Sequence, residues 1–425
     1  MREVIGGGSA ACAILWGGKL FCQGGNDTGQ LGDGTAFLGT EMCLQTDLST
    51  RACRPVPAAV AAPAPATTGD LENVRHASSA YLASCAVTSD GNVYCWGIND
   101  HLQLGHAKSI DVACGPTNVC NSRPTQVKLP VPLLAQDVAM GLRSACALTT
   151  DGAVYCWGDN EFGQLGVPLT TVSSETPVKV TGLPSSATAP VTQLRVDKDD
   201  YPMGCALAGG QVYCWGANYG GALGHDPAMD PACGSTACSF GAQAVRTSQG
   251  FLTGIVEIGV GRNWGCALDG NGAVWCWGAD SYGTNGIGTS SSARFTADKV
   301  GGNLPTISHI AIDGWHDAFA IDAAGNVFGW GRNSYGSLAL GKVGNGPGCG
   351  GGCEWLPVPT LLKSVAQLSS GGNVGLALLT DGSVVGWGEN ALAQLGHLPG
   401  TDGDVSTPGF WTNPTPAPVK CPVKK

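Results

Sequence analysis

Short apolar segments along the chain alternate with turns rich in Gly, Asp and Asn, and no segment carries a helical period. This pattern is typical of β-strands joined by tight turns. Within it, an aromatic residue followed by Cys-Trp-Gly, or a close variant of that segment, marks one strand of an internal repeat. The seven copies lie at residues 21–24, 94–97, 155–158, 213–216, 275–278, 328–331 and 385–388.

Each repeat predicts four short antiparallel strands. A first strand such as 255–259 is followed by a variable turn, a Cys-Ala-Leu strand, a tight turn, the Cys-Trp-Gly strand, a Gly-rich loop and a Pro-led strand such as 177–180. One such sheet cannot bury both of its faces, so the sheets are expected to stack radially until a ring closes. The sequence therefore predicts an all-β fold, a seven-bladed β-propeller of four-stranded antiparallel blades.

The propeller is expected to occupy residues 1–425 as a single domain. We further expect the C-terminal strand near 416–420 to complete the N-terminal blade, because this would close the ring and remove its open edges. The repeat cores lie near 12–32, 85–105, 146–166, 205–224, 266–286, 319–339 and 376–396.

Ten of the cysteines occupy one pair of equivalent positions. A three-residue turn at 89–91 brings Cys85 directly opposite Cys95, with Gly91 at the left-handed position that such turns require. Directly opposed residues of an antiparallel pair lie close enough for a disulfide. In the last two repeats both cysteines are replaced together, as expected of a bonded pair. The predicted cross-strand disulfides are Cys12–Cys22, Cys85–Cys95, Cys146–Cys156, Cys205–Cys214 and Cys266–Cys276.

Eight further cysteines lie in the loops after the Cys-Trp-Gly strand. We interpret them as local disulfides, Cys43–Cys53, Cys114–Cys120, Cys233–Cys238 and Cys349–Cys353. Metal binding is the alternative, with His106, Cys114 and Cys120 in one loop and His225, Cys233 and Cys238 in another. The favoured prediction has no metal and no cofactor. Cys421 is left without an assigned partner.

Charge and cysteine content narrow the class of protein. The chain has 22 Lys and Arg against 32 Asp and Glu, a net charge of −10, and no basic stripe, which argues against a nucleic-acid partner. No apolar run reaches the roughly 20 residues of a membrane helix. Nineteen cysteines favour an oxidising compartment, so we expect the protein to be extracellular, on the cell surface or periplasmic. Because the chain starts at Met1 without an apolar signal region, we expect a leader to have been removed.

Residues 157–166, Trp-Gly-Asp-Asn-Glu-Phe-Gly-Gln-Leu-Gly, together with Cys146-Ala147-Leu148 and Asp151-Gly152 upstream, resemble the regulator of chromosome condensation repeat. The resemblance covers essentially the whole chain and implies a seven-bladed propeller. Members of that family include an exchange factor for a small GTPase, a plant UV-B photoreceptor and a bacterial inhibitor of β-lactamases, so the family does not settle the function. The disulfides favour a secreted, bacterial-type member.

The turns before the Cys-Ala-Leu strands vary among otherwise equivalent repeats, and all should project from the same rim. Tyr, Trp, Arg and Asp gathered on one rim are typical of a protein-recognition surface. The repeated Trp residues at 96, 157, 215, 277, 330 and 387 are instead expected in the core. The predicted binding residues are Tyr81, Arg143, Asp199, Asp200, Tyr201, Arg262, Asn263, Trp264, Trp315, His316, Asp317 and Asn373.

The favoured function is a secreted scaffold that recognises a macromolecule, preferably a protein, through this rim. A carbohydrate or cell-surface binder is one alternative, with Trp264, Trp315 and Tyr201 as stacking platforms. An enzyme with a site on the rim or in the channel is another, with its acid and base among Asp199 and Asp200, next to Tyr201, and His316 and Asp317. The chain lacks a Gly-x-Ser-x-Gly elbow, a phosphate loop and a His-Glu-x-x-His segment. A non-enzyme is therefore favoured.

Overall fold

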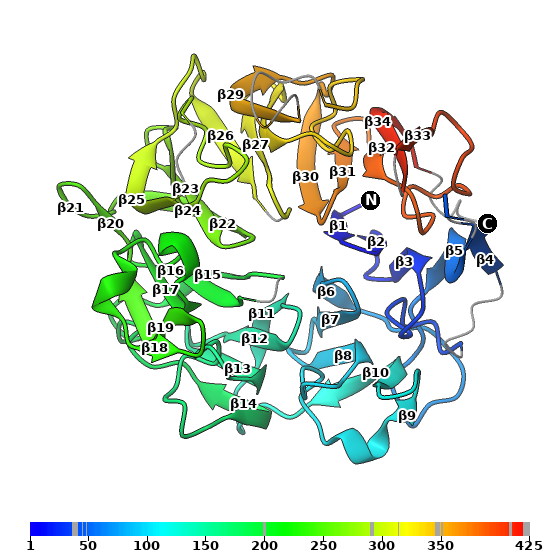
Figure 1. Cartoon of the computed structure of the whole chain (residues 1–425). Helices are drawn as coiled ribbons and strands as arrows, with labels where there is room; N and C mark the ends of the chain where they lie inside the picture. Colours follow the sequence, from blue (N-terminus) through cyan, green and yellow to red (C-terminus); the bar gives the residue numbers. More distant parts are fainter. Residues whose placement is uncertain are drawn as a thin grey trace.

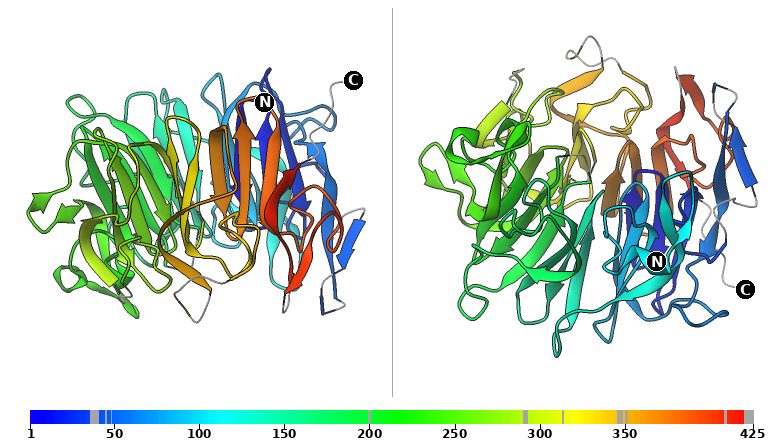
Figure 2. Two further views of the ribbon diagram at one scale, coloured as in Figure 1. Left: turned by 90° about the horizontal axis from the view of Figure 1, so that it is seen from above. Right: turned by 60° about the horizontal axis from the view of Figure 1, so that its bottom comes forward.

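The computed structural model describes residues 1–35, 41–44, 46–47, 49–198, 201–289, 293–312, 314–344, 349, 352–407 and 410–419. Seven antiparallel sheets surround a central channel as the blades of a propeller (Figure 1), and their strands run across the thickness of the ring (Figure 2). This confirms the predicted fold class. Four blades carry a fifth, short outer strand that the sequence did not predict.

The first three blades follow one another in sequence. Blade 1 contains β1 (Glu3–Gly7), β2 (Ala10–Ile14), β3 (Leu20–Gly25), β4 (Glu41–Leu44) and β5 (Thr50–Ala59). Blade 2 contains β6 (Val74–Ser79), β7 (Ala83–Thr88), β8 (Val93–Ile98), β9 (Val112–Ala113) and β10 (Val119–Val127). Blade 3 contains β11 (Ala135–Met140), β12 (Ser144–Thr149), β13 (Val154–Asp159) and β14 (Ser173–Lys179).

The remaining blades repeat the same order. Blade 4 contains β15 (Val191–Val196), β16 (Met203–Ala208), β17 (Gln211–Ala217), β18 (Ala232–Cys233) and β19 (Thr236–Ala244). Blade 5 contains β22 (Ile255–Gly261), β23 (Trp264–Asp269), β24 (Val274–Ala279) and β25 (Ala293–Lys299). Blade 6 contains β26 (Ile307–Ala311), β27 (Asp317–Asp322), β28 (Val327–Arg332) and β29 (Cys353–Pro359). Blade 7 contains β30 (Val365–Gly371), β31 (Val374–Leu379), β32 (Val384–Glu389), β33 (Val405–Thr407) and β34 (Phe410–Pro418).

A few short elements lie outside the blades. A small hairpin of β20 (Arg246–Thr247) and β21 (Gly250–Phe251) connects blades 4 and 5. Three 3-10 turns lie in the loops: η1 (Lys108–Ile110), η2 (Tyr219–Gly221) and η3 (Pro227–Met229). Among the described residues, no helix has the length and apolar character needed to cross a membrane.

The second and third strands of each blade have the predicted register. Cys85 pairs with Cys95 across β7 and β8, and the turn between these strands places Gly91 at φ +79°. The five cross-strand cysteine pairs have Cα atoms 4.0–4.1 Å apart, and the four loop pairs have Cα atoms 5.5–5.8 Å apart. All nine predicted pairs are disulfides in the structure. Cys421 lies outside the described residues.

The ring does not close as predicted. The C-terminal strand β34 pairs with β32 of its own blade, and blade 1 obtains its outer strand β5 from the N-terminal segment. Blades 7 and 1 are therefore held by side chains: Gln367 Oε1 accepts from the Val4 amide at 3.1 Å, and Ser369 Oγ accepts from the Gly6 amide at 2.9 Å. The expectation of a shared blade was wrong because the N-terminal segment supplies a complete blade by itself. We call this 7–1 interface the seam.

The repeated Trp residues of blades 2 to 7 each form a hydrogen bond with the preceding blade. Trp96 lies in β8 of blade 2, and its indole Nε1 donates to the Gln30 carbonyl of blade 1 at 2.9 Å. A Cβ on Gly32 would lie 2.5 Å from that indole nitrogen, which explains the glycine that follows Gln-Leu. The same bond, at 2.6–3.0 Å, is made by Trp157, Trp215, Trp277, Trp330 and Trp387.

Candidate functional site

The turns between first and second strands share one face with the loops that follow the third strands, because the strands of each blade alternate in direction. We call these turns and loops together the rim. The rim brings predicted residues from different blades together. Asp199 and Asp200 lie outside the described residues, so their place on the rim stays a prediction.

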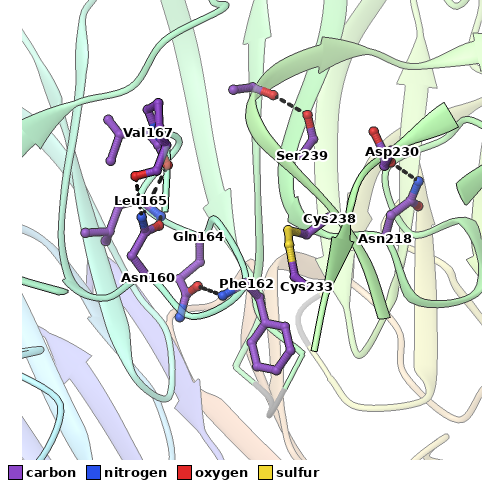
Figure 3. The surroundings of a disulfide bond; sticks show 12 residues. Asn160, Phe162, Gln164, Leu165, Val167, Asn218, Asp230, Cys233, Cys238 and Ser239 are labelled. Carbon is purple, nitrogen blue, oxygen red and sulfur yellow. Dashed lines mark hydrogen bonds between the residues drawn. A yellow bond between two sulfur atoms is a disulfide. The ribbon is translucent and has the colours of Figure 1, made fainter. Parts of the chain in front are cut away.

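Tyr201 belongs to an aromatic cluster between blades 3 and 4. Its ring stacks on Tyr219 with centroids 5.1 Å apart, and it meets Phe162 edge-on at 5.5 Å. Phe162 also packs with the Cys233–Cys238 disulfide, which braces the loop of blade 4 (Figure 3). Tyr219 keeps 49% of its surface exposed. A rigid apolar platform with phenolic edges results.

Trp315 lies at the centre of a second group. Its ring stacks on that of Tyr81 with centroids 6.1 Å apart, although Tyr81 belongs to blade 2 and Trp315 to blade 6. The guanidinium of Arg262 lies 5.9 Å from the Trp315 ring. Trp315 O also accepts from Trp264 Nε1 at 3.1 Å. Half-buried side chains from three blades therefore meet at Trp315.

Arg332, at the end of β28, lies between two tyrosines. Its guanidinium carbon is 5.0 Å from the centre of the Tyr282 ring and 4.9 Å from that of Tyr335. Tyr282 in turn contacts the His316 imidazole at 4.4 Å between centroids, and Tyr335 meets Phe410 edge-on at 5.3 Å. This row of side chains spans blades 5, 6 and 7.

The row has a positive electrostatic character. Burial, together with the positive charges of Arg262 and Arg332, lowers the pKa of His316 to about 3. The imidazole is therefore neutral at physiological pH. The two guanidinium groups supply the positive charge of this part of the rim.

The opposite half of the rim carries acidic residues. In blades 1 to 3, the residue that directly follows the repeated Asn of the loop after the third strand is acidic: Asp27, Asp100 and Glu161. Arg143, a predicted binding residue, lies 3.9 Å from Asp159 and 3.6 Å from Glu161. Its charge is thus compensated within the chain, unlike that of Arg332.

Four predicted rim residues are buried instead. Trp264 is fully buried and bonds to the neighbouring blade, and Asp317 is 2% exposed. The backbone N–H of Asn263 donates to Asp197 Oδ2 at 3.0 Å, and Asn373 Nδ2 donates to Glu389 Oε2 at 3.0 Å. Each lies at or directly before the start of a second strand, where the blade begins to pack. Their place in a variable turn was therefore not enough to predict whether these residues are exposed or buried.

Phe162, Tyr219, Tyr282 and Tyr335 follow the repeat and are not among the binding residues predicted from the sequence. The structure places them on the rim, in contact with the predicted binding residues. The available signal was their variation: in blades 1 and 2, Thr28 and His101 correspond to Phe162, Tyr282 and Tyr335, and Asp27 and Asp100 correspond to Tyr219.

The metal alternative is not supported by the loops. Cys114–Cys120 and Cys233–Cys238 are disulfides, so their sulfur atoms are not free thiolates. His106 Nε2 lies 2.8 Å from Asp111, and His225 Nε2 lies 2.8 Å from Asp230. Within the described ranges, no group of three or more His, Cys, Asp or Glu residues is placed to hold a metal ion.

The central channel contains a cavity of about 220 Å³ lined by the first strands. Its ionisable side chains pair across blades: His76 lies 2.7 Å from Glu3 and 3.0 Å from Asp137. Burial alone would lower the pKa of His76, but Asp137 and Glu3 raise it to about 9. Glu257 accepts from the Ile310 amide at 3.2 Å. These groups join the first strands of neighbouring blades.

Known proteins resemble this chain in both sequence and fold. The human regulator of chromosome condensation is 28% identical over 358 residues, which cover 81% of this chain and 78% of the human protein. Prp20p from Saccharomyces cerevisiae has a TM-score of 0.74 at 19% identity, covering 97% of this chain and 88% of the yeast chain. Yeast RCC1 (Prp20) in its complex with Kap60 has a TM-score of 0.73 at 18% identity, covering 96% and 85%.

The two yeast structures show a shared fold, and the match to the family extends over nearly the whole chain. The RCC1-like domain family matches residues 19–421, and this chain therefore belongs to that family.

Proposed function

We propose that the chain is an exported interaction scaffold that binds a protein partner through the rim. The observation that carries this proposal is the continuous row of aromatic and Arg side chains over blades 5 to 7, because Tyr, Trp and Arg supply most hot spots of protein interfaces. These side chains are held by neighbours from other blades, so little conformational entropy is lost on binding.

The similar yeast proteins favour a protein as the partner of this chain, but they do not identify that protein. Yeast RCC1 (Prp20) was crystallised with Kap60 bound, and Prp20p has binding properties towards Gsp1p and histones. The partner of this chain is a separate question, because the rim side chains that we propose lie in turns that vary even between its own repeats.

The compartment is also a proposal. Eighteen of the 19 cysteines are paired, which is typical of proteins from oxidising compartments and consistent with a secreted, bacterial-type member of the family. Alkylation of the denatured, unreduced protein from its native source should label one thiol, that of Cys421. Labelling of more than two thiols would contradict both the disulfide set and the proposed export.

A triple variant tests the rim. Tyr201→Ala, Trp315→Ala and Tyr335→Ala together should abolish capture of the protein partner from the native extracellular milieu, because they remove three half-exposed rings of the rim, one on blade 4 and two on blade 6. The matched control replaces Val131, Leu134 and Phe251, which are exposed apolar residues outside the rim, with Ala. Equal capture by both folded variants and the parent protein would overturn the proposal.

Carbohydrate remains a second candidate for one part of the rim. Tyr219 is exposed and lies flat on Tyr201, which is a geometry that sugar rings use for stacking. If a glycan array gave Tyr219-dependent binding and the triple variant still captured protein, the carbohydrate function would be favoured.

A further inference from the structure

Arg332 differs from the other rim arginines in what surrounds it. Its Nε donates to Ser334 Oγ at 3.3 Å, and its guanidinium carbon lies 5.0 Å from the centre of the Tyr282 ring and 4.9 Å from that of Tyr335. Among the residues that the structure describes, none places a carboxylate within 4.0 Å of the Nη atoms. The loop that follows, residues 333–352, contains Lys342 and no acidic residue.

This environment makes Arg332 a preformed anion receptor. Contact with two aromatic rings and the Nε bond to Ser334 restrict the guanidinium and leave its Nη atoms for a ligand. A fixed guanidinium edge matches the two oxygens of a carboxylate and binds them with two parallel hydrogen bonds. The entropy that a free Arg side chain loses on binding is already lost here.

The charges around Arg332 favour an acidic ligand at this place and disfavour it elsewhere on the rim. Burial lowers the pKa of His316, and the positive charges of Arg262 and Arg332 beside it lower that pKa further, although the whole chain carries a net charge of −10. On blades 1 to 3, Asp27, Asp100 and Glu161 would repel the same ligand. The rim therefore distinguishes one end of a docked partner from the other.

We propose that Arg332, held between Tyr282 and Tyr335, anchors an acidic segment of the protein partner by pairing with an Asp or Glu side chain, whose apolar neighbours pack on the two tyrosines. This inference rests on the proposed function and adds the chemistry of the partner and its orientation on the ring. The partner's acidic segment lies on blades 5 to 7.

The test measures binding of a synthetic peptide of alternating Glu, Asp and Leu residues to the intact protein by calorimetry at low salt. The same peptide with Gln and Asn in place of Glu and Asp should not bind. Arg332→Gln should weaken binding of the acidic peptide about tenfold or more, and Tyr282→Leu should weaken it to a lesser degree. Polyphosphate and polygalacturonate are tested in parallel, because they carry anionic groups from other classes of macromolecule.

Arg246→Gln is the matched control. Arg246 also stacks on an aromatic ring, with its guanidinium carbon 5.0 Å from the centre of the Phe251 ring, but it lies on the β20–β21 hairpin outside the rim. This variant should bind the acidic peptide as the parent does, and all variants should keep the parent's thermal midpoint. If the Arg332→Gln variant does not fold, Arg332→Lys takes its place in the test. The Lys keeps the positive charge but cannot form two parallel hydrogen bonds with a carboxylate, so this variant should still bind the acidic peptide more weakly than the parent.

Three results would overturn the inference: equal binding by the folded Arg332→Gln variant, equal binding of the amide peptide, or tighter binding of either polyanion than of the acidic peptide. None of these would affect the capture experiment with the triple rim variant. A partner that is captured through the rim without dependence on Arg332 would leave the proposed function in place and remove only this inference.

Discussion

Six of the seven blade interfaces are built around a Trp, and the seam is not. At the seam, Gln23 occupies the position of the Trp, and its Nε2 donates to the Gln394 carbonyl at 2.9 Å, the same acceptor that the indoles use elsewhere. A hydrogen bond to this loop carbonyl is therefore present at the seam as well, but the seam has no indole ring at this position. A small apolar cavity, about 30 Å³ and lined in part by Val4, Leu376 and Val419, lies beside Gln23.

The difference shows which interaction defines a blade interface. Gln23 at the seam and the Trp residues at the other interfaces all donate to a buried carbonyl of the Gln-Leu-Gly loop. This hydrogen bond is therefore the feature that all seven interfaces share, and the Trp ring adds buried apolar area. Because these loops carry the rim, the same bonds also fix the positions of Tyr282 and Tyr335 relative to their neighbours. The rim's geometry therefore depends on interfaces that contribute nothing to binding directly.

Removing a Trp at a regular interface should have the largest effect on stability. Trp330→Ala deletes a fully buried ring and its bond to the Thr284 carbonyl, and should lower the free energy of unfolding by about 3–5 kcal/mol. Denaturant unfolding monitored by circular dichroism measures it. A loss no larger than that of a Gln23 substitution would contradict the comparison.

Substitution of Gln23 should have an intermediate effect. Gln23→Leu keeps the size of the side chain but leaves the Gln394 carbonyl without its donor, which should cost about 1–3 kcal/mol. Gln126→Leu is the control, since Gln126 is exposed and should change stability by less than about 0.5 kcal/mol. Equal effects at both positions would mean that the seam does not need the bond.

The pH dependence of stability tests the channel side of blades 1 to 3. The pKa of His76 is raised from 6.5 to about 9 by Asp137 and Glu3, against the effect of burial, so the protonated form stabilises the folded state. This contribution is complete below pH 6.5 and is lost as the pH rises from 6.5 through 9. His76→Gln should flatten the fall in stability over that range. His309→Gln, at an exposed side chain of the same channel, should not.

The smallest effects should be equal at the seam and at a regular interface. Ser369 Oγ accepts from the Gly6 amide at 2.9 Å across the seam, and Ser78 Oγ accepts from the Met140 amide at 3.0 Å between blades 2 and 3. Each Ser→Ala change should cost about 0.5–1.5 kcal/mol. A clearly larger cost for Ser369→Ala would show that the seam depends more on these inner bonds than the other interfaces do.

The repeat allowed the blades, the registers and the five cross-strand disulfides to be predicted, because each is a local consequence of strand spacing and turn type, and the four loop disulfides join cysteines close together in the sequence. The closure of the ring was not predictable in this way. Either end of the chain could supply the outer strand of blade 1, and only the pairing of β5 with β3 shows that the N-terminal segment does so. The role of Gln23 was equally hidden, since it read as an imperfect copy of the repeat.

The rim was predicted in outline but not residue by residue. Tyr81, Tyr201, Arg262, Trp315 and His316 contact side chains from other blades. Trp264 and Asp317 lie in the same turns and are buried, because the blade begins to pack at their positions. The contacts of Arg332 with Tyr282 and Tyr335 were not predicted, because contacts between loops of successive blades leave no pattern within a single repeat.

The most direct test of the proposed function is photo-crosslinking of the protein in its native milieu. A photoreactive amino acid is placed at Tyr219 or Tyr335 on the rim, and at Val131, an exposed residue outside it, for comparison. We expect one protein to be crosslinked from both rim positions and not from position 131. Crosslinking of the same partner from position 131 alone would contradict the claim that the rim is the binding surface.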